Sequence, residues 1–126
     1  MRFEELSCFA QARKRFLSDD EYVKLKESLI ANPRAGDVVP GSGGLRKLRW
    51  GDPARSTGKR SGLRIVYYVV ESDRLLMIYA YGKDKQTDLT DDQKKAFKAL
   101  IAEVKKERDQ KKAEQQRSTT QRRRRR

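Results

Sequence analysis

The chain has 126 residues, room for one compact domain, and its 31 Lys and Arg outnumber its 18 Asp and Glu to give a net charge of +13. This excess favours a polyanionic partner, either nucleic acid or an anionic membrane surface, with charge that only keeps the chain soluble as the alternative. Histidine is absent, which excludes histidine acid–base chemistry and histidine-containing metal sites.

The N-terminal third predicts a helical hairpin. Residues 2–5 are either a short strand or the approach to a helix, and the residues leave both readings open. Residues 7–16 are predicted to be helical, because large apolar side chains recur there at spacings of three and four. A second helix is predicted to begin after Ser18, whose hydroxyl is a typical N-cap with Glu21 as its capping-box partner, and to end near residue 31.

The middle of the chain predicts a small antiparallel sheet. Residues 37–44 hold a proline and three glycines and are predicted to form a loop. Three strands are predicted after it, at residues 45–50, 63–71 and 74–81. A basic, glycine-rich loop at residues 51–61 joins the first two. Because strands that follow one another through short connections pair antiparallel, we expect a sheet of three or four strands.

The C-terminal part predicts a helix followed by a tail. Thr90 and Gln93 form a second capping box, and apolar residues follow at the spacing of one buried helix face. The order of elements makes residues 1–107 one α+β domain. Residues 108–126 carry nine basic and two acidic residues and only one apolar residue, Ala113. Such a segment buries too little surface to offset its ordering entropy, so that we predict a disordered basic tail.

A cluster of cations is predicted on the first two strands. Side chains two residues apart on a strand point to the same face, so that Lys47 and Arg49 lie together, opposite the core-facing Leu48 and Trp50. If the strands pair around the basic loop, Arg64 joins the same surface. Further candidates for binding RNA, as cations or as rings on which bases stack, are Arg46, Arg55, Lys59, Arg60, Tyr68 and Tyr81.

Such a cluster suits phosphodiester chemistry. In-line attack on phosphorus concentrates negative charge on the non-bridging oxygens, and preorganised Lys and Arg stabilise that charge without histidine or a metal. In RNA the nucleophile can be the substrate's own 2′-hydroxyl. The residues alone leave two readings open, a Lys–Arg ribonuclease and a simple binding surface, of which the binding surface is the commoner.

The remaining composition favours a cytoplasmic protein. Cys8 is the only cysteine, so that no intramolecular disulfide can form, and it is predicted to be a small apolar filler. No apolar run approaches the ~18 residues of a membrane span. We therefore expect no signal peptide, no membrane contact, no metal and no cofactor.

Three segments, taken in order and at suitable spacing, resemble the RelE/HigB family of type II toxins: residues 43–50, 58–68 and 81–85. Residues 17–22 and 32–41 also resemble the HigB-like branch, and the likeness covers roughly residues 3–106. The resemblance implies a bacterial toxin that enters the ribosomal A site and cleaves mRNA. It also implies a RelE/ParE-like fold and a neutralising antitoxin, typically one with a helix-turn-helix DNA-binding domain.

The resemblance implies a catalytic set. The two basic residues that alternate on the strand before the basic loop map onto Lys47 and Arg49, and the arginine after a glycine at the start of the next strand maps onto Arg64. Lys83, after the glycine that follows the third strand, completes the set, and Lys85 is assigned to RNA binding. None of these roles requires a cofactor.

The chain departs from the RelE pattern at two positions. Asp84 stands where the family has an arginine, and Thr90 stands where it has a tyrosine. Tyr68, Tyr81 or a lysine are then the alternatives for handling the proton. Three functions follow: a ribosome-dependent mRNA endonuclease, which we favour, a ParE-like gyrase inhibitor of the same fold, and a non-catalytic RNA-binding module.

Overall fold

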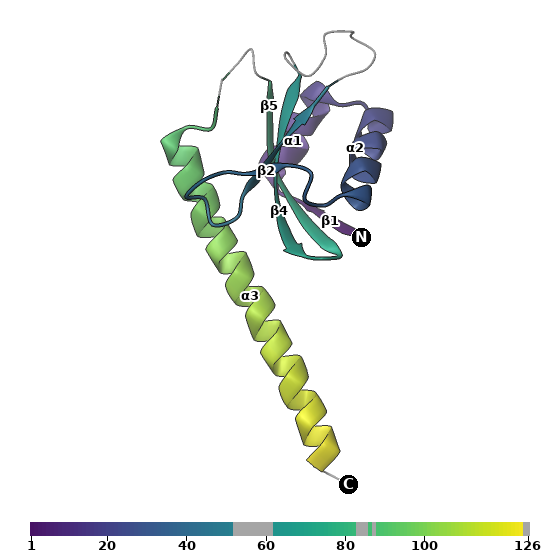
Figure 1. Cartoon of the computed structure of the whole chain (residues 1–126), viewed down its shortest axis with the longest axis vertical. Helices are drawn as coiled ribbons and strands as arrows, with labels where there is room; N and C mark the ends of the chain where they lie inside the picture. Colours follow the sequence, from purple (N-terminus) through teal and green to yellow (C-terminus); the bar gives the residue numbers. More distant parts are fainter. Residues whose placement is uncertain (52–61, 83–85, 87, 125–126) are drawn as a thin grey trace.

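The computed structural model describes residues 1–51, 62–82, 86 and 88–124, with side chains described as far as residue 116. Within these residues the chain is α+β, with three helices and a five-stranded mixed sheet of strand order β1-β5-β4-β3-β2 (Figure 1). The elements are β1 (Arg2–Glu5), α1 (Ser7–Phe16), α2 (Asp19–Ala31), β2 (Asp37–Val38), β3 (Arg46–Trp50), β4 (Leu63–Glu71), β5 (Arg74–Gly82) and α3 (Asp91–Arg124).

The helix starts are those that the capping boxes predict. The Ser18 hydroxyl accepts a hydrogen bond from the Glu21 amide at 3.2 Å at the start of α2. At the start of α3 the Thr90 hydroxyl accepts from the Gln93 amide at 3.1 Å, and the Gln93 side chain accepts from the Thr90 amide at 3.0 Å. Both pairs satisfy amides that have no partner within the helix, which fixes where each helix begins.

The sheet differs from the prediction in size and in direction. The antiparallel pairs β3–β4 and β4–β5 are as predicted, but β2 adds a two-residue strand at one edge and β1 pairs parallel with β5 at the other. Arg74 fastens β1 by donating two hydrogen bonds to the Glu4 carboxylate, from Nε at 2.5 Å and from Nη2 at 2.9 Å. A prediction built on short turns misses the pairing of β1, because α1 and α2 lie between β1 and the other strands in the sequence.

Each face of the sheet is covered by a separate hydrophobic core. Helices α1 and α2 pack apolar side chains, including Phe9 and Leu25, against one face. On the other face α3 packs through Ile101, beside Val39 and Leu45 of the segment between α2 and β3. The predicted apolar face of the last helix is confirmed, since its other members also pack against this second core: Phe97, Leu100 and Val104.

A bulge in β5 changes which side chains face α3. Val66 pairs with Tyr79 and Tyr67 with Met77, so that Ile78 is an extra residue on β5. The strand alternation therefore shifts by one: Ile78, Tyr79 and Tyr81 belong to the core on the α3 side of the sheet. Without the extra residue, Tyr81 would face α1 and α2 instead.

The segment predicted to be a disordered tail is helical in the structure, where α3 continues without interruption to Arg124. Two contacts attach the first part of this segment to the body: Arg108 Nη1 donates to the Val70 carbonyl at 2.9 Å, and Lys112 lies 3.8 Å from Glu71. Just before the segment, Lys105 Nζ donates to the Gly43 carbonyl at 2.8 Å. The prediction of disorder weighed only apolar burial. A helix that is already nucleated extends at little cost through residues of high helix propensity, and this segment is rich in Lys, Arg, Gln and Glu.

Candidate functional site

The register of β3 and β4 brings the predicted cations together. Lys47 pairs with Val66 and Arg49 pairs with Arg64, and directly opposed residues of two antiparallel strands share a face. Leu48 and Trp50 pack on the opposite face, in the core that also contains side chains of α1 and α2. The structure thus places Lys47, Arg49 and Arg64 on one surface, as the period of two predicts.

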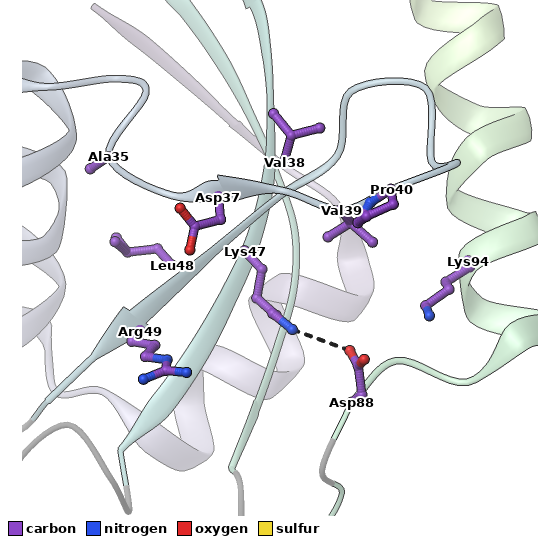
Figure 2. A pocket seen from close by; sticks show the side chains of 10 residues that line it. All are labelled: Ala35, Asp37, Val38, Val39, Pro40, Lys47, Leu48, Arg49, Asp88 and Lys94. Carbon is purple, nitrogen blue, oxygen red and sulfur yellow. Dashed lines mark hydrogen bonds and ion pairs between the residues drawn. The ribbon is translucent and has the colours of Figure 1, made fainter.

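An open pocket of about 650 Å³ lies over this surface (Figure 2). Lys47 and Arg49 reach it from β3, and Asp88 and Lys94 reach it from the start of α3. Its remaining wall is the chain around β2 together with one residue of β3: Ala35, Asp37, Val38, Val39, Pro40 and Leu48. α3 covers one end of this face of the sheet, and the pocket lies at the end where α3 begins.

Asp88 places a negative charge among these cations. Its Oδ1 lies 3.3 Å from Lys47 Nζ and accepts a hydrogen bond from the Leu89 amide at 2.7 Å (Figure 2). The Leu89 hydrogen bond, and then the hydrogen bond and charge of Lys47, hold the pKa of Asp88 below its ordinary value. The Lys47 side chain is 30% exposed and that of Asp88 51%, so that water reaches this ion pair. The Asp88 carboxylate is therefore ionised at neutral pH, and the pair is open to exchange.

Sequence reasoning missed Asp88. The residue lies 41 positions from Lys47, and an acid shortly before a helix is common because it complements the helix dipole. No local pattern separates it from its neighbours Asp91 and Asp92. Only the fold, which brings this chain segment beside Lys47 of β3, identifies Asp88 as a site residue.

Arg64 differs from the other two cations because it is buried, with 5% of its surface exposed. Its Nη1 lies 3.3 Å from the Gly62 carbonyl, to which it donates. Gly62 fixes the approach of β4 to β3, since a Cβ at this position would lie 2.5 Å from the Trp50 carbonyl oxygen. Arg64 thus supplies a fixed charge beneath the surface that Lys47 and Arg49 present to solvent.

Tyr81 lies directly opposite Arg64 on β5. It is 2% exposed, and its hydroxyl has no hydrogen-bond partner among the described residues. Burial, and then the negative charge of Asp88, raise the pKa of Tyr81, while the charge of Arg64 opposes them. The hydroxyl is protonated at neutral pH and can act as a donor. The buried ring is not a surface on which a base stacks, so that this part of the prediction is wrong.

Two further predicted RNA-binding residues lie away from the pocket. Tyr68 is 5% exposed and packs beneath α3, with Lys105 Nζ 5.8 Å from its ring centroid. Arg46 shares the face of Leu48, and its Nη1 donates to the carbonyls of Gly36 at 2.7 Å and Arg34 at 3.3 Å. Arg46 therefore fastens the turn after α2, and neither residue meets a ligand in the pocket.

The other predicted site residues lie outside the described part of the chain: Arg55, Lys59, Arg60, Lys83 and Lys85.

No protein-family model matches the chain. None of the described helices has the length and apolar character needed to cross a bilayer. Over the same described residues, no three Cys, Asp or Glu side chains gather as a metal site would require. Fold and site define an α+β domain with a basic pocket on one face of its sheet.

Proposed function

We propose that the chain is the toxin of a type II toxin–antitoxin system, a ribosome-dependent endoribonuclease that cleaves translated mRNA in the cytoplasm. The observation that carries the proposal is the convergence of Lys47, Arg49 and Arg64 on one face of the sheet, with the first two lining an open pocket. These are three of the four positions to which the RelE/HigB resemblance assigns catalysis, and the fourth, Lys83, lies outside the described residues. The α+β class of the chain, with two helices before the β3–β5 meander and one after it, is compatible with the fold that this resemblance implies.

The chemistry needs no metal. The 2′-oxygen of the substrate forms a bond to phosphorus and the bond to the 5′-oxygen breaks, so that one proton leaves the 2′-hydroxyl and one reaches the 5′-oxygen. Lys47 and Arg49 are placed to hold the non-bridging oxygens, and the fixed charge of Arg64 stabilises the negative charge that develops on them. The Tyr81 hydroxyl on the same face is the candidate donor of the second proton.

The partners follow from the same proposal. The substrate is mRNA in the ribosomal A site, and the neutralising partner is an antitoxin of the helix-turn-helix type. Lys83 and Lys85 are proposed to extend the site, and the 51–61 loop with Arg55, Lys59 and Arg60 is proposed to contact RNA.

A translation assay with ribosome-bound mRNA tests this function. The double variant Lys47→Ala, Arg49→Ala removes two solvent-facing cations of the pocket and is expected to abolish cleavage, at least a hundredfold loss for two charge-stabilising groups. The control is the double variant Lys14→Ala, Lys24→Ala, with the same change of charge on exposed positions of α1 and α2. Equal cleavage by both double variants contradicts the proposal.

A non-catalytic RNA-binding module is the second candidate, and one observation favours it: Asp88 neutralises Lys47 in the pocket. In that case the chain binds RNA in a salt-dependent manner and leaves it intact. Gel analysis of the bound RNA separates the two candidates, and a DNA gyrase supercoiling assay run in parallel tests the gyrase-inhibiting alternative.

A further inference from the structure

The distal part of α3 extends beyond the body of the protein. The helix has 34 residues, and its last described contacts with the sheet are the hydrogen bond from Arg108 to Val70 and the ion pair of Lys112 with Glu71. Figure 1 shows the helix continuing away from the sheet beyond this point. We name residues 113–124 the arm. At about 1.5 Å per residue, Arg122 lies some 21 Å along the axis from Arg108.

The positive charge of α3 is concentrated at the far end of the arm. Residues 91–116 carry eight basic and six acidic residues, so that most charges there are balanced. Two ion pairs show this balance: Lys111 lies 3.0 Å from Glu107, and Lys112 lies 3.8 Å from Glu71 on the sheet. Residues 117–124 at the end of α3 then carry four arginines and no acid, and the sequence continues with Arg125 and Arg126 outside the described residues. The helix therefore separates a concentrated cation cluster from a body that has its own basic pocket.

The chemistry of the arm selects one class of partner. A helix that binds a membrane surface needs an apolar face, and Ala113 is the only apolar residue of the arm. Arginine offers a planar fork of donors that matches phosphate oxygens, and a run of arginines matches a row of phosphates. A structured RNA presents such rows over tens of ångströms, which suits two basic surfaces held apart on one molecule.

We propose that the arm is a second RNA-binding surface, which engages phosphates of structured RNA at a fixed distance from the pocket. The inference shares its partner class with the proposed function, but it stands on the length and charge of α3 and not on catalysis. The helix is essential to it: a flexible tail with the same arginines would add attraction without fixing where they act.

The test uses the full chain and an RNA duplex of about 20 base pairs, long enough to span both surfaces. Truncation after Gln116 removes six arginines, and the slope of log affinity against log salt is expected to fall by up to about 5. An unchanged slope overturns the proposal. So does tighter binding of the full chain to vesicles rich in phosphatidylserine, or to poly-glutamate, than to the duplex at equal anionic charge.

A pair of variants at Glu114 isolates the role of the helix. Glu114→Pro and Glu114→Ala remove the same charge, but proline also removes a helix hydrogen bond and clashes with the preceding turn, so that α3 ends near residue 113. We expect the proline variant to bind the duplex at least severalfold more weakly than the alanine variant, with lower helicity by circular dichroism. If the two variants bind the duplex equally while the proline variant has lost helicity, the arginines act as a flexible tail, and the proposal of an arm is overturned.

The Lys47→Ala, Arg49→Ala variant separates this inference from the proposed function. Its cleavage reports on the pocket, whereas the difference between the two Glu114 variants reports on the arm. Loss of cleavage together with equal Glu114 variants leaves the function standing without the arm. If the wild-type chain itself does not cleave and the two Glu114 variants differ in affinity, the arm binds RNA on a protein that is not a nuclease.

Discussion

Asp88 is the residue at which a small change gives the most informative result. The Asp88 carboxylate is paired with Lys47. A substrate phosphate must displace this carboxylate before Lys47 can bind the phosphate. Asp88→Asn removes the charge but retains an oxygen that can accept from the Leu89 amide, so that the turn before α3 is kept. We expect this variant to bind RNA more tightly than the wild-type chain.

The magnitude follows from the exposure of the pair. An ion pair at 3.3 Å whose side chains are 30% and 51% exposed is largely screened by solvent, and such pairs contribute about 0.2–1 kcal/mol. Removing the competitor therefore raises affinity by up to about fivefold. If Lys47 then gains one phosphate contact, the dependence of log affinity on log salt for single-stranded RNA steepens by about 0.7.

The assay is fluorescence anisotropy of a short single-stranded RNA, measured over a range of salt. Asp20→Asn is the control, because it makes the same change of charge at an exposed position of α2, on the opposite side of the sheet. Equal gains from the two variants would refute the pairing argument and leave only net charge. Because the pKa of Asp88 lies below its ordinary value and the chain has no histidine, wild-type affinity is expected to be flat between about pH 6 and pH 8.

Three other predictions concern the frame that holds the site. Tyr67→Phe removes a hydroxyl that bridges two backbone groups of the turn after α2, at 2.9 Å each, and is expected to lower the free energy of unfolding by about 1–3 kcal/mol in urea titrations. Arg74 lowers the pKa of Glu4 chiefly by hydrogen bonding. The Glu4–Arg74 pair therefore stabilises the fold fully above the ordinary pKa of ~4.3, and this stabilisation is lost as the pH falls through the lowered pKa of Glu4 in the folded protein. In Glu4→Gln the melting temperature should consequently fall less on acidification than it does in the wild type. Gly62→Ala forces a Cβ against the Trp50 carbonyl and should lower both the melting temperature and RNA affinity, whereas a variant that melts as the wild type contradicts this contact.

Local signals were sufficient for the starts of the helices and for the central strands. Each capping box lies within four residues of sequence: the Thr90–Gln93 box forms both of its hydrogen bonds, and at Ser18 the N-cap bond from the Glu21 amide forms. The period of two correctly separated Lys47 and Arg49 from Leu48 and Trp50, because β3 has one core-facing and one solvent-facing side. Where a few neighbouring residues determine the outcome, the sequence is enough.

The features that failed are those decided by distant parts of the chain. β2 has two residues, too few to show a period, and the parallel pairing of β1 depends on contacts such as Glu4 with Arg74. The bulge at Ile78 lies in a strand that is apolar throughout, so that no alternation exists in the sequence for it to disturb. Burial of Arg64 and the position of Asp88 likewise depend on how the ends of strands and the start of α3 meet.

The anchoring of Asp88 limits how the pocket can open. Leu89 is buried in the core between the sheet and α3, and its amide donates to Asp88. Moving the whole turn away from Lys47 would draw Leu89 out of that core, at a cost of about 1.5–3 kcal/mol for exposing a leucine side chain. Rotation of the Asp88 side chain breaks only the solvent-exposed ion pair and one hydrogen bond, which costs less. An incoming phosphate is therefore expected to exchange with the carboxylate at Lys47 while the backbone of the turn stays in place. A structure with a bound phosphate analogue in which residues 88–90 have shifted as a unit would contradict this, because it would show that the Leu89 anchor yields before the side chain does.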